Sequence, residues 1–405
     1  MDFKFSKYHV FVVGLLAFLQ FTIVLDFMIL SPLGVLVMEE LIITTQQFGL
    51  VVSAYAFSAG LAGILAAGFA DRFDRKKMLL FFYLGFVIAT FLCGISPTYN
   101  FLLSVRILTG LFAGVISSIS FAIVADLFPL QVRGRVMGFI MTAFAASQVF
   151  GLPIGIYISN VWGWQSPFLM IALISGIVGF LIFFYLKPLT THLDDKVDRR
   201  AVHHLIKTLS ESKYFPAYIV TTLLATGGFM LMPFGSAFSV HNLGVKLDDL
   251  PMVYMVTGIV SMIGGPLMGR LSDAIGKYRM FVIASFLAAA IILYYTRLQF
   301  TPLPIVIIIN SFLFVFITAR MISANALTSA VPDLHDRGAF MAISSSIQQI
   351  SGGIAASIAG LIVVQSKSGF MERYEILGYV VAVAILITIG LMYNVNQIAT
   401  NKHTK

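Results

Sequence analysis

Long apolar stretches recur along the whole chain, and they constrain its fold more than any other feature. Hydrophobic residues make up 59% of the 405 residues and charged residues 11%, whereas a soluble domain carries roughly 25% charged residues. A helix needs about 20 apolar residues to cross a hydrocarbon core. Lipid cannot hydrogen-bond the backbone, and the sequence lacks the alternating short segments of a membrane barrel. The pattern therefore predicts an all-α membrane protein with about twelve transmembrane helices.

The distribution of Lys and Arg predicts the orientation of these helices. If the N-terminus is cytoplasmic, most of the 26 Lys and Arg residues fall in cytoplasmic segments. The segments on the opposite side contain Lys246, Arg297, Lys367 and Arg373. Cytoplasmic loops of membrane proteins carry an excess of these residues. We therefore expect a multi-pass protein of the bacterial inner membrane with both termini cytoplasmic and a first helix that is retained.

The longest polar stretch divides the chain near its middle. It predicts an N-terminal six-helix bundle over 1–187, a cytoplasmic linker over 188–213, and a C-terminal six-helix bundle with a short cytoplasmic tail over 214–405. Part of this linker is a candidate for a short helix on the membrane surface. His203 and His204 lie in the linker, and we interpret them as solvated residues rather than metal ligands.

The two predicted halves contain related sequence segments. The segment GILAAGFADRFDRKKML at 63–79 aligns with GPLMGRLSDAIGKYRMF at 265–281, which places Asp71 opposite Asp273. Internal repeats of this kind are typical of secondary transporters. We therefore expect two pseudo-symmetric bundles.

The first of these segments resembles a signature of the major facilitator superfamily, Gly-x-Leu-Ala-Asp-Arg-x-Gly-Arg-Lys, in which Ala67 and Asp74 replace the two glycines. The segment LLSVRILTGLFAGV resembles the fourth-helix motif of the same family through Arg106, Gly110 and Gly114. The resemblance covers essentially the whole chain. It implies the major facilitator fold and a monomeric secondary transporter that is not an enzyme.

The resemblance also implies a gating role for charged residues near the loop after the second span. In the family, the aspartate that corresponds to Asp71 is thought to contact the eleventh helix and to hold one state of the transport cycle. We expect Arg75 to pair with Asp126 at the cytoplasmic end of the fourth span. The alternative is that the cations of this loop only retain it in the cytoplasm. The expected gating residues are Asp71, Arg72, Arg75, Asp126 and Asp273.

Three ionisable side chains, those of Asp26, Arg106 and Arg320, lie inside predicted spans. Such groups are costly in a membrane, so each is a candidate functional residue. The segment LDFMILSP around Asp26 resembles the first-helix motif of drug–proton antiporters, which implies that Asp26 carries the proton; the alternative is a structural carboxylate. Arg106 is its expected partner in proton coupling, although helical rise places the two at depths that differ by about 10 Å. Arg320 either faces the cavity, which would favour an anionic substrate, or reaches the inner interface.

Uncharged amides complete the predicted substrate cavity, although such amides more often join helices. The expected cavity residues are Asp26, Arg106, Gln148, Asn310, Arg320 and Gln348. The sequence contains no Gly-x-x-x-x-Gly-Lys-Ser/Thr loop, and its single cysteine, Cys93, lies in an apolar stretch. We therefore expect no ATP-driven pumping, no cofactor and no metal centre.

These features lead to one main functional hypothesis, a proton-coupled exporter of small organic or amphipathic molecules that works by alternating access, like multidrug efflux antiporters. Its expected partners are a small-molecule substrate, protons and the lipid bilayer. No nucleic-acid binding is expected, because the positive-inside bias explains the net charge of +8. The alternative is a transporter of an anionic metabolite or a lysolipid-like amphiphile, either an exporter or a proton symporter. A non-transporting sensor or lipid-handling protein is a third class.

Overall fold

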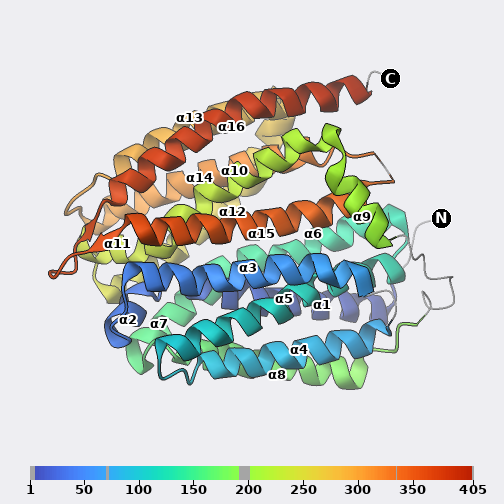
Figure 1. Cartoon of the computed structure of the whole chain (residues 1–405), viewed down its shortest axis with the longest axis horizontal. Helices are drawn as coiled ribbons and strands as arrows, with labels where there is room; N and C mark the ends of the chain where they lie inside the picture. The colour runs from blue at the N-terminus through green and yellow to red at the C-terminus, as the bar shows by residue number, and fades with distance from the viewer. Residues whose placement is uncertain (1–4, 70–72, 191–200, 334, 404–405) are drawn as a thin grey trace. The chain divides into compact units, whose positions relative to one another are not determined.

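The computed structural model describes residues 5–69, 73–190, 201–333 and 335–403, and these residues are almost entirely helical (Figure 1). Among them, eleven helices are long and apolar enough to cross a membrane by length and composition. A further helix, α15, is 26 residues long and is less apolar because it contains several serine, glycine and glutamine residues. The predicted all-α membrane fold with about twelve long helices is therefore confirmed.

The long helical segments follow the chain in order. They are α1 (Lys7–Ile29), α3 (Thr45–Phe69), α4 (Arg75–Cys93), α5 (Tyr99–Leu127), α6 (Leu130–Ala146) continued through the π-helix η2 (Ser147–Gly151) into α7 (Leu152–Trp162), α8 (Ser166–Tyr185), α10 (Phe215–Leu231) continued through η5 (Met232–Phe234) into α11 (Gly235–His241), α12 (Leu250–Ile275), α13 (Lys277–Tyr295), α14 (Leu303–Thr328), α15 (Arg337–Ile362) and α16 (Tyr374–His403). The short elements are α2 (Gly34–Glu40), α9 (Ala201–Ser210), η4 (Ser212–Tyr214), η6 (Leu247–Asp249), β1 (Val364–Gln365) and β2 (Met371–Glu372).

The chain forms two compact units. Unit 1 consists of Met1–Leu30 and Ala54–His203, and unit 2 consists of Ser31–Ser53 and His204–Lys405. The main boundary falls inside the predicted linker. Residues 31–53, by contrast, group with the C-terminal half of the chain, so the single helix α3 is divided between the two units. The sequence pattern did not indicate this division.

In unit 1, α1 packs against α6 and α8, and α4 packs against α5 and α8. Their buried faces form an apolar core that includes Leu16, Tyr83 and Ile119. The long helices of the unit run alongside one another (Figure 1). Burying one apolar stripe on each helix against its neighbours is the arrangement that a membrane bundle requires.

Two glycines of the fourth-helix motif bring α5 against the backbone of α3 within unit 1. A Cβ atom on Gly110 would lie 2.3 Å from the carbonyl oxygen of Tyr55, and one on Gly114 would lie 2.2 Å from that of Ala59. Only a residue without a side chain fits at such distances. Small residues commonly allow this close approach between membrane helices.

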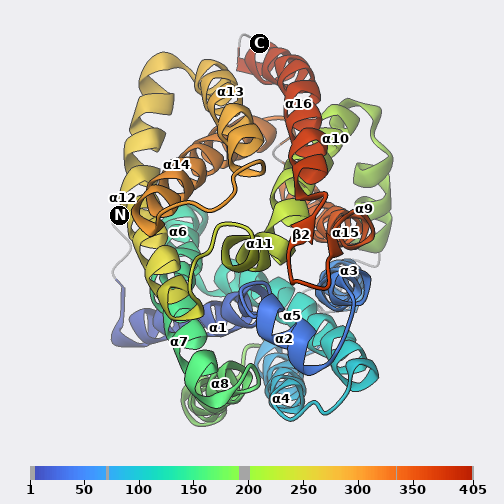
Figure 2. The same cartoon turned by 90° about the vertical axis from the view of Figure 1, so that its left-hand side faces the viewer.

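In unit 2, α10 packs against α15 and α16, α13 against α14 and α16, and α12 against α14. The core of this unit includes Tyr214, Phe281 and Met392. Strands β1 and β2 form a short antiparallel hairpin, and β2 lies beside α11 (Figure 2). The side chain of Asn242 holds this hairpin, because its amide nitrogen donates to the Met371 carbonyl at 3.0 Å and its oxygen accepts from the Met371 N–H at 2.8 Å.

The glycine contact between α5 and α3 gives a first prediction. Gly114→Leu should destabilise the protein by about 1–3 kcal/mol, because the added atoms meet backbone that cannot move aside. Thermal unfolding in detergent measures the effect. The matched control is Gly176→Leu in α8, since a Cβ atom there meets no atom within 4 Å. Equal unfolding temperatures for the two variants would contradict the packing that we describe.

Candidate functional site

Asp26 and Arg106 form a buried ion pair in unit 1. Asp26 lies near the end of α1, and Arg106 lies in the second turn of α5. The Arg106 Nη1 atom is 2.8 Å from Asp26 Oδ2 and also donates to the Asp26 carbonyl oxygen at 3.3 Å. The two side chains are 0% and 1% exposed. The expected partnership is therefore a direct contact, and the roughly 10 Å difference in depth that helical rise suggested does not separate the two charges.

Side chains from three other helices enclose this ion pair. Thr90 of α4 donates a hydrogen bond to the second carboxylate oxygen of Asp26, at 3.2 Å. The Tyr55 ring of α3 lies against the guanidinium, with 4.5 Å between its centroid and Arg106 Cζ, and the Phe168 ring of α8 lies at 5.9 Å. These rings supply cation–π attraction while they exclude water. Because neither charge has solvent to stabilise it, each depends on the other.

Sequence reasoning did not identify Thr90 or Tyr55 as members of this site. Each is a polar residue in an apolar span, and this type of residue usually joins helices. Tyr55 belongs to the site because Gly110, one turn after Arg106, lets α3 approach α5 at that level. Arg106 and Gly110 lie one turn apart and therefore on one face of α5. This spacing was the sequence signal from which a close approach of another helix beside Arg106 could have been predicted.

A π-helical turn lies beside α1 close to the ion pair. It is η2 (Ser147–Gly151), and it contains the predicted cavity residue Gln148, which is partly buried. The Ser147 hydroxyl donates to the Phe21 carbonyl of α1 at 3.1 Å, and Gly151 lies against the side chain of Leu25. Single π-turns inside helices occur frequently at functional sites. No sequence pattern indicated this turn.

The other predicted cavity residues belong to unit 2. The Asn310 amide donates to the Val306 carbonyl of its own helix at 3.0 Å, and Gln348 is partly buried in α15. Arg320 is buried in α14, where its Nε donates to the Ser285 hydroxyl at 2.9 Å and its guanidinium lies 5.7 Å from the ring centroid of Phe281. Arg320 thus contacts α13, and its place in a substrate cavity or at the inner interface stays a prediction. A cavity shared by these residues with Asp26 and Arg106 stays a prediction.

One of the expected gating contacts is present in unit 1. Arg75 Nε lies 3.1 Å from Asp126 Oδ2, and the arginine side chain is buried. Asp71 and Arg72 lie outside the described residues. Asp273 is exposed and pairs with Lys277, one turn later, at 2.8 Å. The structure therefore supplies the pair between Arg75 and Asp126, whereas the gating role of all five residues stays a prediction.

Asp74, which replaces a family glycine, begins α4. Its carboxylate accepts from the N–H of Lys76 at 2.8 Å, as a helix N-cap does. The same oxygen accepts from the N–H of Leu189 at 3.1 Å, and the Leu189 carbonyl accepts from the N–H of Arg75 at 3.2 Å. These bonds attach the segment that follows α8 to the start of α4. The substitution therefore gives this helix a cap and an anchor.

Membrane-length helices that enclose a buried pair of opposite charges define a multi-pass membrane protein whose buried charges are candidate functional residues. The family model of the Major Facilitator Superfamily matches residues 16–356 and 218–397. The chain belongs to the major facilitator superfamily.

Individual relatives and solved structures agree with this family. The uncharacterized MFS-type transporter YceJ of Bacillus subtilis is 26% identical over 85% of this chain and 87% of its own length. Multidrug resistance protein 2 of the same organism is 27% identical over 60% of this chain and 62% of its own length. The fold is similar to that of a bacterial homolog of the human lysosomal transporter Spinster, with a TM-score of 0.80 and 14% identity over 98% of this chain and 99% of that one. The D-xylose–proton symporter has a TM-score of 0.74 and 17% identity over 94% and 97%.

The enclosed ion pair gives a second prediction. Arg106→Met should cost about 3–5 kcal/mol of unfolding free energy, because it leaves the Asp26 carboxylate buried without its cation. The double variant Asp26→Asn with Arg106→Met should recover part of that loss, since no charge is then stranded. Chemical unfolding of the purified protein in detergent measures both. A double variant no more stable than Arg106→Met would argue against mutual dependence of the two charges.

Proposed function

We propose that the protein is a proton-coupled antiporter that exports small organic or amphipathic molecules. The observation that carries this proposal is the water-excluded pair between Asp26 and Arg106. Two relatives support the export of drugs by their names: one is the multi-drug resistance efflux pump PmrA of Streptococcus pneumoniae, and the other is multidrug resistance protein 2 of Bacillus subtilis. The same proposal places the protein in the bacterial inner membrane with both termini in the cytoplasm.

Protonation of Asp26 is the step that would couple the proton to a conformational change. A neutral Asp26 no longer compensates the charge of Arg106, which then lies in dry surroundings without an anion. Leaving one member of such a pair alone costs about 3–5 kcal/mol, which is enough to shift a two-state equilibrium by a factor of roughly a hundred or more. The state in which Arg106 meets water or substrate is then favoured. A proton can in this way change which conformation is populated.

Helix α3 offers a second element for this mechanism. Its first half contacts α15 within unit 2, where a Cβ atom on Gly49 would lie 2.9 Å from the carbonyl oxygen of Ala356. The Ser357 hydroxyl donates to that of Ser53 at 2.7 Å, and Thr45 donates to the Val363 carbonyl at 2.7 Å. This contact consists of small residues and two hydroxyl bonds, so it can open without leaving a charge buried. We propose that it opens and closes during alternating access.

The second candidate, a transporter of an anionic metabolite or a lysolipid-like amphiphile, depended on a net positive cavity. Arg320 was to supply the second cation, but its guanidinium contacts Ser285 and Phe281 of α13. The place of Arg320 in the cavity stays a prediction, so this candidate rests on no described contact between Arg320 and the Asp26 site. Proton flux on adding substrate to proteoliposomes still separates the mechanisms, because antiport moves protons opposite to the substrate and symport moves them with it.

The role of Asp26 gives a third prediction. Asp26→Asn should abolish uphill transport of a fluorescent lipophilic cation driven by a pH gradient in proteoliposomes, because the amide binds no proton. Binding of the same dye should persist, since the neutral amide, like protonated Asp26, favours the state in which Arg106 meets water or substrate. Asp26→Glu, which keeps a titratable group, is the matched control and should retain part of the uphill transport. Uphill transport by Asp26→Asn at the wild-type rate would refute the proton-carrier role.

The α3–α15 contact gives a fourth prediction. In a Cys93→Ala background, the pair Ser53→Cys and Ser357→Cys should form a disulfide, because the two hydroxyls are already in contact. Oxidation should stop transport and reduction should restore it, whereas each single variant should be insensitive to oxidant. Dye transport measured before and after reduction tests this. Unchanged transport by the fully cross-linked protein would mean that α3 and α15 stay together throughout the cycle.

A further inference from the structure

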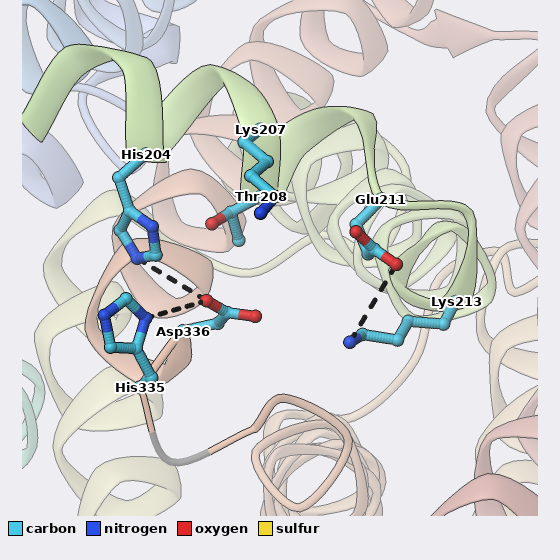
Figure 3. Close-up of a pocket in the computed structure, with 7 residues that line it drawn as sticks. All are labelled: His204, Lys207, Thr208, Glu211, Lys213, His335 and Asp336. Atoms are coloured by element: carbon cyan, nitrogen blue, oxygen red, sulfur yellow. Dashed lines mark hydrogen bonds and ion pairs between the residues drawn. The ribbon is translucent and has the colours of Figure 1, made fainter. Parts of the chain in front are cut away.

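Three side chains with metal-ligating atoms meet in unit 2, whereas Asp26 belongs to unit 1. His204 belongs to α9, and His335 and Asp336 directly precede α15. One ligand atom from each lies within 4.8 Å of the other two. Figure 3 shows the two imidazoles converging on the Asp336 carboxylate from different segments of the chain. At the sequence level we interpreted His204 as a solvated linker residue rather than a metal ligand, and its two partners lie far along the chain.

The distances in this cluster suit a small tetrahedral ion. His204 Nε2 lies 3.5 Å from Asp336 Oδ1, and His335 Nδ1 lies 3.3 Å from the same oxygen. Two ligands bound at about 2.0–2.2 Å to one tetrahedral zinc ion lie roughly 3.3–3.5 Å apart. The existing separations therefore need little change to accept an ion. Two imidazoles and one carboxylate also form a donor set that divalent transition metals bind.

The carboxylate in this cluster is oriented by its surroundings. Asp336 Oδ2 accepts a hydrogen bond from the Tyr214 hydroxyl at 2.7 Å, and this leaves Oδ1 directed at both imidazoles. The same hydroxyl accepts from the N–H of Asp333 at 3.2 Å, which fixes the start of the turn. The hydrogen bond from Tyr214 also lowers the pKa of Asp336 below its usual range. Such outer hydrogen bonds are typical of metal ligands.

The cluster lies in a pocket that is also lined by Lys207 and Lys213. These cations must be considered, because lysines also suggest an anion site. Lys213 already pairs with Asp333 at 2.8 Å and lies 3.9 Å from Glu211, so its charge is compensated. Lys207 is the other lysine of the pocket (Figure 3). An anion would have to bind beside both Glu211 and Asp336, where like charges repel it. The carboxylates therefore favour a cation.

We propose that His204, His335 and Asp336 bind one divalent transition-metal ion of the zinc class, with water in the fourth position. The ion would join α9 to the connection between α14 and α15. It would thereby fix the linker helix onto unit 2, so that metal binding controls the mobility of α9. This inference does not depend on the substrate or on proton coupling.

Titration calorimetry of the purified full-length protein with zinc chloride, after removal of metal with a chelator, tests the proposal. Wild type should bind one zinc ion per chain more tightly than His335→Ala or Asp336→Asn, by at least tenfold. His335 is 84% exposed, so His335→Ala should fold as wild type does, and its unfolding temperature in chelator checks this. Zinc should raise the unfolding temperature of wild type and leave that of His335→Ala unchanged.

Two further variants separate a metal site from the alternatives. Lys207→Ala should keep or increase zinc affinity, because it removes a repelling charge from the pocket. Tyr214→Phe should weaken zinc binding without abolishing it, and the cobalt-substituted protein should keep the intense visible absorption of a tetrahedral site. The proposal is overturned if zinc affinity is unchanged in His335→Ala. It is also overturned if inorganic phosphate binds instead, with an affinity that Lys207→Ala abolishes.

Discussion

The ion pair between Asp26 and Arg106 is the interaction on which the organisation of unit 1 depends. A charge of either sign is expensive in a dry helical bundle, and this pair brings the two opposite charges into one short contact. The ion pair requires α1 and α5 to be in contact at Asp26 and Arg106. Thr90 of α4 and Tyr55 of α3 then contact the same two side chains. A polar interaction thereby specifies how four helices meet. An apolar surface alone cannot specify this, because lipid tails contact an apolar surface as well as another helix does.

Close packing around this pair depends on glycines as well as on the rings of Tyr55 and Phe168. Gly110 and Gly114 bring α5 against one part of α3, and Gly49 brings another part of α3 against α15. The same helix is thus held by small residues along two stretches that belong to different units. The pair fixes the level at which the helices meet, and the glycines fix how near they come. Both are needed to keep water from the two charges.

The sequence was sufficient to predict the elements but not all of the contacts. Apolar length predicted the helices, because a bilayer leaves little choice of structure. Asp26 and Arg106 stood out since charges are rare in such spans, yet helical rise alone could not show that they touch. The contacts of Arg320 were missed because its partner, Ser285, is an ordinary serine in a neighbouring helix. The π-turn at Ser147–Gly151 and the cluster at His204 depend on tertiary contacts that no local pattern encodes.

The enclosure of the ion pair also provides an optical reporter. The chain contains two tryptophans, and one of them, Trp164, is fully buried with its ring 6.3 Å from that of Phe168. Phe168 in turn lies over the Arg106 guanidinium. Entry of water or a ligand at the charged pair would disturb this row of rings and change the emission of the buried indole. Trp162 is largely exposed, so the two indoles lie in different surroundings, and a change in the emission of Trp164 can report the state of the pair between Asp26 and Arg106.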